Sequence, residues 1–391
     1  MQHSLLLHRL VLFRGLLDLP VYQKLSLLLA DDGTDTVRFI DHYTGFVAEL
    51  YSHTDNLSEY IKKTVYESDN LYLRQIVENK PASPHITSAL NEELKILEEL
   101  SRITPQDLPS PCPESLPEWN TTTIDLVSGY ADRMANIHRT GYGIFAAHHM
   151  FLVKDNQILP LRYPDPQTLD DLYGYEAEKN KVIANTLALL NGKPAVNVLL
   201  YGDAGTGKSS TVKAIVNEYA SMGLRLIEIK KSQFETIPTL IEELASNPLK
   251  FILFIDDLSF AEGDGDFAAL KAILEGSAAA RTKNIVIYAT SNRRHLVRVT
   301  FRGREGDDIH LNETLEETIS LSARFGLVIT FQKPDRDAYL EIVSSLAEEH
   351  GLTIPQETLF KGAEMHALRS SGRTPRAAKH YIELLAANTT K

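Results

Sequence analysis

Residues 202–209 read Gly-Asp-Ala-Gly-Thr-Gly-Lys-Ser, a pattern whose chemistry suits the phosphate groups of a nucleotide. Glycines at these spacings let backbone N–H groups surround phosphate oxygens, and a helix that begins here adds partial positive charge. In this P-loop pattern the lysine reaches the β- and γ-phosphates, and the serine hydroxyl binds Mg²⁺. We therefore predict nucleotide binding by Gly202, Asp203, Ala204, Gly205, Thr206, Gly207, Lys208, Ser209 and Ser210, with Lys208 also catalytic and Ser209 also a magnesium ligand.

A second candidate is the acidic pair Asp256 and Asp257, which follows the apolar run Phe251–Ile255. In a Walker B element the first carboxylate, Asp256, holds Mg²⁺ through its water shell. The second, Asp257, orients or deprotonates the attacking water. On its own, an acidic pair after a strand is more often a helix cap or a turn. The P-loop upstream favours the magnesium role for Asp256 and the catalytic role for Asp257.

Three further polar residues follow at later points of the chain. Asn292 comes just after the apolar run Asn284–Ala289, so it could hydrogen-bond the attacking water or the γ-phosphate, although an asparagine that only caps a loop is the alternative. Arg324 could act as an arginine finger on a neighbouring subunit's γ-phosphate, or it could be an ordinary surface arginine. Arg376, or else Arg373, could fold back onto the phosphates from the helix that Pro375 begins.

The elements that must position these residues follow from a change of pattern near residue 167. Short apolar runs there alternate with helical stretches, which predicts an α/β fold with a five-stranded parallel sheet. The predicted strands are Val196–Tyr201, Leu224–Ile229, Phe251–Ile255, Asn284–Ala289 and Leu327–Phe331. Only helical segments follow, which indicates a small C-terminal helical lid.

The domain boundaries follow from the same patterns. We predict a mainly helical N-terminal domain over residues 1–165, which ends in a β-hairpin around the turn residues Asp155 and Asn156. The α/β core is expected over 166–333 and the lid over 334–391. Composition fits this reading, because 43% hydrophobic and 24% charged residues are ordinary globular values.

The motifs in this order resemble those of the AAA+ ATPases over about residues 167–391. The linker segment Asp171–Glu176 precedes the P-loop, the Walker B pair, sensor 1 at Asn292, the arginine finger and sensor 2. The strings YGDAGTGKSSTVKA, FILFIDDLSF, YATSNRRHL and SLSARFGL are similar to those of one uncharacterised bacterial AAA+ family. The resemblance implies ATP and Mg²⁺ as ligands, a ring or other oligomer, and Tyr173 and Tyr175 flanking the adenine.

Three departures qualify the resemblance. Asp257 stands where most members have glutamate, and the shorter acid argues against fast hydrolysis. The segment Lys231–Glu235 lacks the aromatic-apolar-glycine pore loop of protein unfoldases, so threading of polypeptides is unsupported. The polar stretch 302–317 is an insertion to which no role is assigned.

Charge and cysteine content narrow the possible environment and partners. The net charge of −12 opposes a broad nucleic-acid-coating surface, and the single cysteine, Cys112, excludes an intramolecular disulfide. No run of about 18 apolar residues occurs, so we expect a cytoplasmic protein without a membrane span.

Three functions remain open. The leading hypothesis is an oligomeric ATPase whose acidic N-terminal domain recognises a protein partner that it remodels or regulates. The alternatives are a nucleic-acid-associated ATPase like replication initiators or helicase loaders, favoured by the Asp-Asp ending and by Arg293-Arg294, and a slow ATP-dependent switch. A GTPase or a transporter-type ATPase is not favoured, because the Asn-Lys-x-Asp and Leu-Ser-Gly-Gly signatures are both missing.

Overall fold

The computed structural model describes residues 2–78, 80–109, 115–260, 265–275, 282–292 and 323–389. The chain divides into two compact units, residues 1–147 and 148–391. Each unit is built around its own hydrophobic core. Among the described helices, none combines the length and the apolar character needed to cross a membrane.

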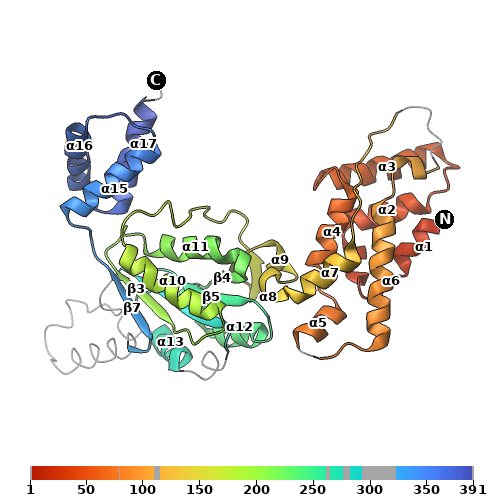
Figure 1. Ribbon diagram of the computed structural model, residues 1–391, viewed down its shortest axis with the longest axis horizontal. Coiled ribbons are helices and arrows are strands. Elements are labelled where there is room, and N and C mark those ends of the chain that lie inside the picture. The colour runs from red at the N-terminus through yellow and green to blue at the C-terminus, as the bar shows by residue number, and fades with distance from the viewer. Residues whose placement is uncertain are drawn as a thin grey trace. The chain divides into compact units, whose positions relative to one another are not determined.

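The first unit is helical, as predicted (Figure 1). Side chains of asparagine, aspartate or serine cap several of its helices by accepting hydrogen bonds from free backbone N–H groups; Asp35, for example, accepts from Val37 and Arg38. Its core gathers Phe39, Phe46 and Trp119 with many leucines. The helices are α1 (Gln2–His8), α2 (Pro20–Ala30), α3 (Thr36–Tyr51), α4 (Leu57–Glu67), α5 (Leu71–Val77), α6 (Pro84–Ser101), α7 (Leu126–Ala135), α8 (Ile137–Thr140) and α9 (Ile144–Ala147).

The second unit contains a seven-stranded sheet in the order β2-β1-β4-β5-β6-β3-β7. The five predicted strands are present and parallel. They are β3 (Val198–Gly202), β4 (Leu224–Glu228), β5 (Lys250–Ile255), β6 (Ile285–Ser291) and β7 (Leu327–Phe331). The strand that leads into the P-loop, β3, lies between β6 and β7, so polar residues that follow β6 are brought next to the loop.

The predicted β-hairpin exists, but its assignment to the N-terminal domain is wrong. Strands β1 (Met150–Lys154) and β2 (Gln157–Pro160) pair in antiparallel register, with Asp155 and Asn156 at φ +50° and +60° in the turn. The backbone of β1 also pairs in parallel with β4. The hairpin therefore extends the sheet from five strands to seven, and the first compact unit ends at residue 147 rather than 165.

Helices cover the sheet and form the lid. Helices α10 (Glu176–Leu190) and α11 (Lys208–Tyr219) pack on one face, where Val182 and Ile215 meet Leu200 and Phe254 in one hydrophobic cluster. Two others, α12 (Ile237–Leu244) and α13 (Gly265–Glu275), also belong to this unit. The predicted lid is formed by α15 (Arg336–Glu349), α16 (Gln356–Arg369) and α17 (Pro375–Thr389), which share a separate small core.

Candidate functional site

The P-loop leaves the end of β3 and enters α11, whose first residue is Lys208. Gly202, Gly205 and Gly207 have φ values of +138°, +80° and +89°, which favour glycine because a side chain is strained there. A Cβ atom at Gly202 would lie 2.0 Å from the carbonyl oxygen of Phe331 on β7. The loop thus has the strand-to-helix geometry that its sequence predicts.

Lys208 lies inside this loop and is only 5% exposed. Its Nζ donates to the carbonyl oxygens of Gly202 at 3.0 Å and Asp203 at 2.7 Å, and to Oδ1 of Asn292 at 3.0 Å. Burial lowers the pKa of Lys208, although nearby carboxylates, beginning with Asp203, oppose this change. The ammonium group is therefore already directed to the concave side of the loop.

The acidic pair lies where β5 ends beside β6. In the parallel register Ile255 is level with Ala289, so the residues that follow them, Asp256 and Thr290, are neighbours. Oδ1 of Asp256 accepts hydrogen bonds from the hydroxyls of Ser209 and Thr290, both at 2.5 Å. Oδ2 of Asp256 makes no hydrogen bond with any described residue. A carboxylate beside a serine hydroxyl is an oxygen-donor set that suits Mg²⁺.

The second acid is linked to the predicted sensor residue. Nδ2 of Asn292 donates to Oδ1 of Asp257 at 2.7 Å, while Oδ1 of the same amide accepts from Lys208. Asp257 has φ +53°, in the left-handed region that few residues other than glycine adopt. The amide of Asn292 therefore connects the P-loop lysine to the Walker B carboxylate.

These groups surround a cavity of about 240 Å³, here called the phosphate-side cavity. Its walls come from the P-loop, the ends of β5 and β6, and the lid. The lining residues are Ala204, Gly205, Gly207, Lys208, Ser209, Ser210, Asp256, Asp257, Thr290, Asn292 and Arg376.

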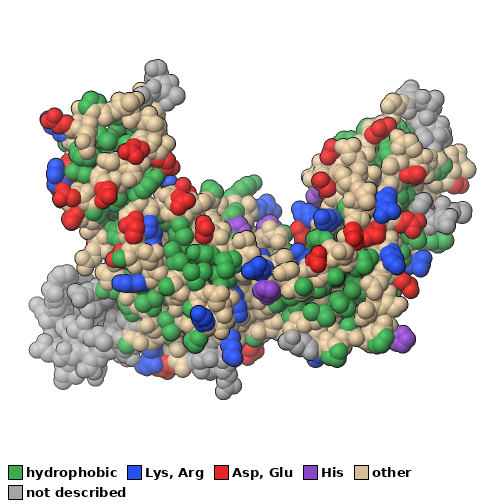
Figure 2. Space-filling view, in the orientation of Figure 1, with side chains coloured by type: hydrophobic (Ala, Val, Ile, Leu, Met, Phe, Trp, Pro, Cys, Tyr) green, Lys and Arg blue, Asp and Glu red, His purple; other side chains and the backbone are tan. Residues whose placement is uncertain are grey.

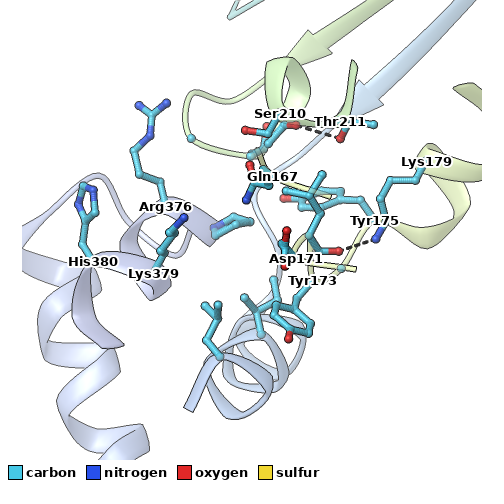
Figure 3. A pocket seen from close by; sticks show the side chains of 18 of the residues that line it. Gln167, Asp171, Tyr173, Tyr175, Lys179, Ser210, Thr211, Arg376, Lys379 and His380 are labelled. Carbon is cyan, nitrogen blue, oxygen red and sulfur yellow. Dashed lines mark hydrogen bonds between the residues drawn. The ribbon is translucent and has the colours of Figure 1, made fainter. Parts of the chain in front are cut away.

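A second cavity of about 310 Å³, the lid-side cavity, shares Gly205, Gly207, Ser210 and Arg376 with the first. The segment before α10, the P-loop and the lid helices α15 and α17 line it, and Figure 3 shows Arg376, Lys379 and His380 extending from the lid.

Both predicted adenine-flanking tyrosines line this cavity. The Tyr175 ring also packs on Phe331 with centroids 5.1 Å apart, and its hydroxyl donates to the Gln332 carbonyl at 2.6 Å. The Tyr173 hydroxyl contacts Glu349 at 3.3 Å. Both rings are thus held by the protein while they border the cavity.

The lid contacts the P-loop through its last helix. The Arg376 N–H at the start of α17 donates to the Gly205 carbonyl at 3.2 Å. A Cβ atom at Gly205 would lie 3.3 Å from both the Thr374 hydroxyl and Cβ of Arg376, so glycine permits this close approach. Of the two sensor 2 candidates, Arg376 lines both cavities, whereas Arg373 forms an ion pair with Glu364 at 2.9 Å.

Residues 145–389 match the protein family described as "Protein of unknown function (DUF815)". The chain belongs to this family. Its P-loop, mostly parallel sheet and helical lid give the DUF815 chain the AAA+ ATPase fold that the motifs predicted.

More distant similarities were also found. A 117-residue segment of the DUF815 chain is 32% identical to the replication factor C large subunit of Staphylothermus marinus, covering 28% of this chain and 27% of that protein. The RuvB Holliday junction branch migration motor of Thermotoga maritima has 19% identity and a TM-score of 0.39, covering 56% of this chain and 63% of that one. A DNA replication initiation factor has 19% identity and a TM-score of 0.36, covering 57% and 65%. The DUF815 chain thus spans less than two thirds of each.

The predicted arginine finger lies away from both cavities of the DUF815 chain. Arg324 forms an ion pair with Glu275 of α13, and its buried Nε has no hydrogen-bond partner among the described residues. Several segments singled out from the sequence lie outside the described residues, namely Cys112, Arg293, Arg294, the insertion 302–317 and Ser320–Ser322.

Sequence reasoning missed two side chains that organise the site. Thr290, which is 1% exposed, bonds both members of the acidic pair. Lys179 of α10 donates to the Leu172 carbonyl at 2.6 Å and so fixes the segment that carries the two tyrosines. The signal available for Thr290 was its position as the first polar residue after the apolar run of β6, level with Asp256.

Proposed function

We propose that this chain binds and hydrolyses Mg·ATP. The observation that carries this proposal is the continuous hydrogen-bonded connection from Lys208 through Asn292 to Asp257, beside the Ser209–Asp256 pair. A structural role alone would not require a buried lysine, an amide and two carboxylates to converge on one cavity at the end of a P-loop.

The roles of the residues follow from their positions. P-loop N–H groups and the start of α11 bind the phosphates, and Lys208 exchanges its bonds to loop carbonyls for bonds to phosphate oxygens. Asp257 and Asn292 orient the attacking water, and Asp257 can accept its proton. Ser209 and Asp256 would hold Mg²⁺, and a bound Mg²⁺ would supply positive charge that stabilises the phosphates. The lid-side cavity would receive the base and ribose.

The test is ATP binding by calorimetry together with phosphate release. Lys208→Ala is expected to weaken ATP binding by about 100-fold, because charge-assisted hydrogen bonds to the phosphates are lost. Lys213→Ala is the matched control, since Lys213 lies on the same helix but pairs with Glu228 at 3.7 Å, away from the cavities. Equal ATP affinity in wild type and Lys208→Ala would contradict the assignment of Lys208 as a phosphate-binding residue.

We further propose that the active form is an oligomer in which Arg324 serves a neighbouring subunit's site. The position of Arg324 outside both cavities of its own chain supports this role, because a finger acting in trans need not reach them. Mixing Arg324→Ala chains with Lys208→Ala chains should restore part of the ATPase activity wherever mixed oligomers form. Failure to restore it, with mixed assembly shown by co-purification of differently tagged chains, would contradict the trans role.

The partner is proposed to be a protein that the helical first unit recognises and that ATP turnover remodels or regulates. A nucleic-acid-associated role is the second candidate, favoured by the 32% identical segment of a replication factor C large subunit and opposed by the net charge of −12. ATPase activity that DNA stimulates with a steep salt dependence would favour it. ATP binding with negligible turnover would instead indicate a slow switch.

A further inference from the structure

Asp256 is held by three donors that act on a single oxygen. Oδ1 accepts from the hydroxyls of Ser209 and Thr290 and from the backbone N–H of Asp257 at 3.1 Å. Because all three bonds meet on one oxygen, rotation of the carboxylate is restricted and Oδ2 stays directed away from the donors. The donor from β6, Thr290, lies outside the P-loop and the Walker B run, two residues before the predicted sensor residue Asn292.

The Thr290 hydroxyl also holds the next residue. It accepts a hydrogen bond from the Asp257 N–H at 3.0 Å while it donates to Asp256. Thr290 is 1% exposed, so bulk water does not replace either bond. One buried hydroxyl therefore fixes a side chain of the acidic pair and the backbone of the following residue.

The backbone that Thr290 holds, at Asp257, lies in the left-handed region. Asp257 has φ +53°, a left-handed conformation that aspartate tolerates better than most residues but that still costs free energy, so the surrounding contacts help to keep it. In this conformation the short carboxylate reaches the Asn292 amide at 2.7 Å. Without the bond to Thr290, an extended backbone would become more accessible and would direct the carboxylate elsewhere.

We propose that Thr290 is a positioning residue that sets the orientation of both Asp256 and Asp257. In this way it fits an aspartate, rather than a glutamate, to the position that activates water. This inference rests on the proposed ATPase function of the same site. Thr290 acts through Asp256 and Asp257 and need not touch the nucleotide.

The test compares Thr290→Val, which removes the hydroxyl at nearly constant shape, with Thr290→Ser, which keeps it. Thr290→Val should lower kcat for ATP about tenfold while changing ATP affinity less than about threefold, and Thr290→Ser should stay within about twofold of wild type. Thr290→Ala is a second hydroxyl-free variant, should the valine not pack. A wild-type kcat in a folded hydroxyl-free variant, or equal loss in Thr290→Ser, would overturn the proposal.

A second readout does not depend on turnover. Hydrogen–deuterium exchange resolved at the Asp257 amide should be faster in the hydroxyl-free variants and unchanged in Thr290→Ser, because that N–H loses one of its two acceptors and keeps only the longer bond to Asp256. Unchanged exchange in all variants would also overturn the proposal. If wild type does not bind ATP, the proposed function fails, yet the exchange comparison still decides whether Thr290 positions Asp257.

Discussion

The two cavities of the candidate site are built in different ways. Around the phosphate-side cavity, hydrogen bonds of 2.5–3.0 Å join the side chains of Lys208, Asn292 and Asp257 in one group and those of Ser209, Asp256 and Thr290 in another. The Asp257 backbone N–H links the two groups through its bond to Thr290 at 3.0 Å. Across the lid-side cavity, the side chains of Lys379 and His380 of α17 are exposed and make no hydrogen bond or ion pair with any described residue. The lid reaches the P-loop there through the backbone bond to Gly205.

This difference indicates that the two cavities contribute to different properties, one to turnover and the other to binding affinity. A hydrogen-bonded set of side chains, anchored by the buried Lys208 and Thr290, keeps its geometry before ligand arrives, as transition-state stabilisation requires. A side built from separate segments, with exposed side chains such as Lys379 and His380, can adjust to its ligand and contributes mainly to affinity. Apart from Lys208, which binds the phosphates themselves, changes on the phosphate side should therefore alter turnover strongly, and changes on the lid side should alter binding moderately.

The largest expected effect is loss of turnover in Asp257→Asn. Asparagine keeps the size and tolerates the left-handed backbone, but it cannot accept a proton from water, so kcat should fall by about 100-fold or more. ATP affinity should change little, since Asp257 lies beside the phosphates without a donor to offer them. Comparing phosphate release with calorimetric affinity checks this, and a parallel fall of both would mean that the phosphate side is not preorganised.

The second-largest effect is expected from a substitution that disturbs the contact between the lid and the P-loop. Gly205→Ala places a methyl group 3.3 Å from Thr374 and Arg376 at φ +80°, so we expect about tenfold weaker ATP binding and about 1–2 kcal/mol lower stability. Gly192→Ala is the control, because Gly192 has φ +66° but nothing within 4 Å. If both variants bind ATP equally well, the close approach of the lid does not matter for binding.

A smaller effect separates the two lid arginines. Arg376→Ala should weaken ATP binding by about fivefold, since one partly exposed charge contact is lost. Arg373→Ala should leave affinity within about twofold, because Arg373 is engaged with Glu364, which also raises its pKa. Titration of both variants with ATP checks the order, and a larger loss in Arg373→Ala would reverse the sensor 2 assignment.

The smallest effect is a dependence of binding on alkaline pH. Burial lowers the pKa of Lys208 below the 10.5 of a free lysine, so the unliganded side chain loses its proton earlier as the pH rises. Phosphate binding requires the charged form, and ATP affinity should therefore decline on approach to pH 10.5. Lys208→Arg stays protonated there and should not show this decline, which calorimetry at a series of pH values would detect.

The parts of the fold that could be predicted from the sequence are those that local chemistry determines. The Asp155-Asn156 turn predicted the hairpin correctly, because these residues tolerate positive φ better than most. The strand that pairs with the hairpin could not be predicted, since β4 lies about 70 residues further along and backbone pairing leaves no sequence signature.

In the candidate site, too, local features could be predicted from the sequence and contacts between distant segments could not. The P-loop is one continuous segment, so its nucleotide-binding residues can be predicted from the sequence. Thr290 acquires its role only from the register that sets Ile255 level with Ala289, and the tyrosine segment is fixed by Lys179 from the next helix. Arg373 and Arg376 could not be separated by spacing, because Glu364, which engages one of them, lies on another helix.

The hairpin has a consequence for how the sheet meets other chains. Strand β1 pairs with β4 and β2 lies outside β1, so the hydrogen-bonding edge of β4 is already covered. The new outer strand is four residues long and ends in Pro160, which has no N–H to donate. Short, proline-bearing edges are poor templates for pairing with a foreign strand. The hairpin thus protects this side of the sheet against aggregation. Self-association of the chain through other surfaces can leave this protection in place.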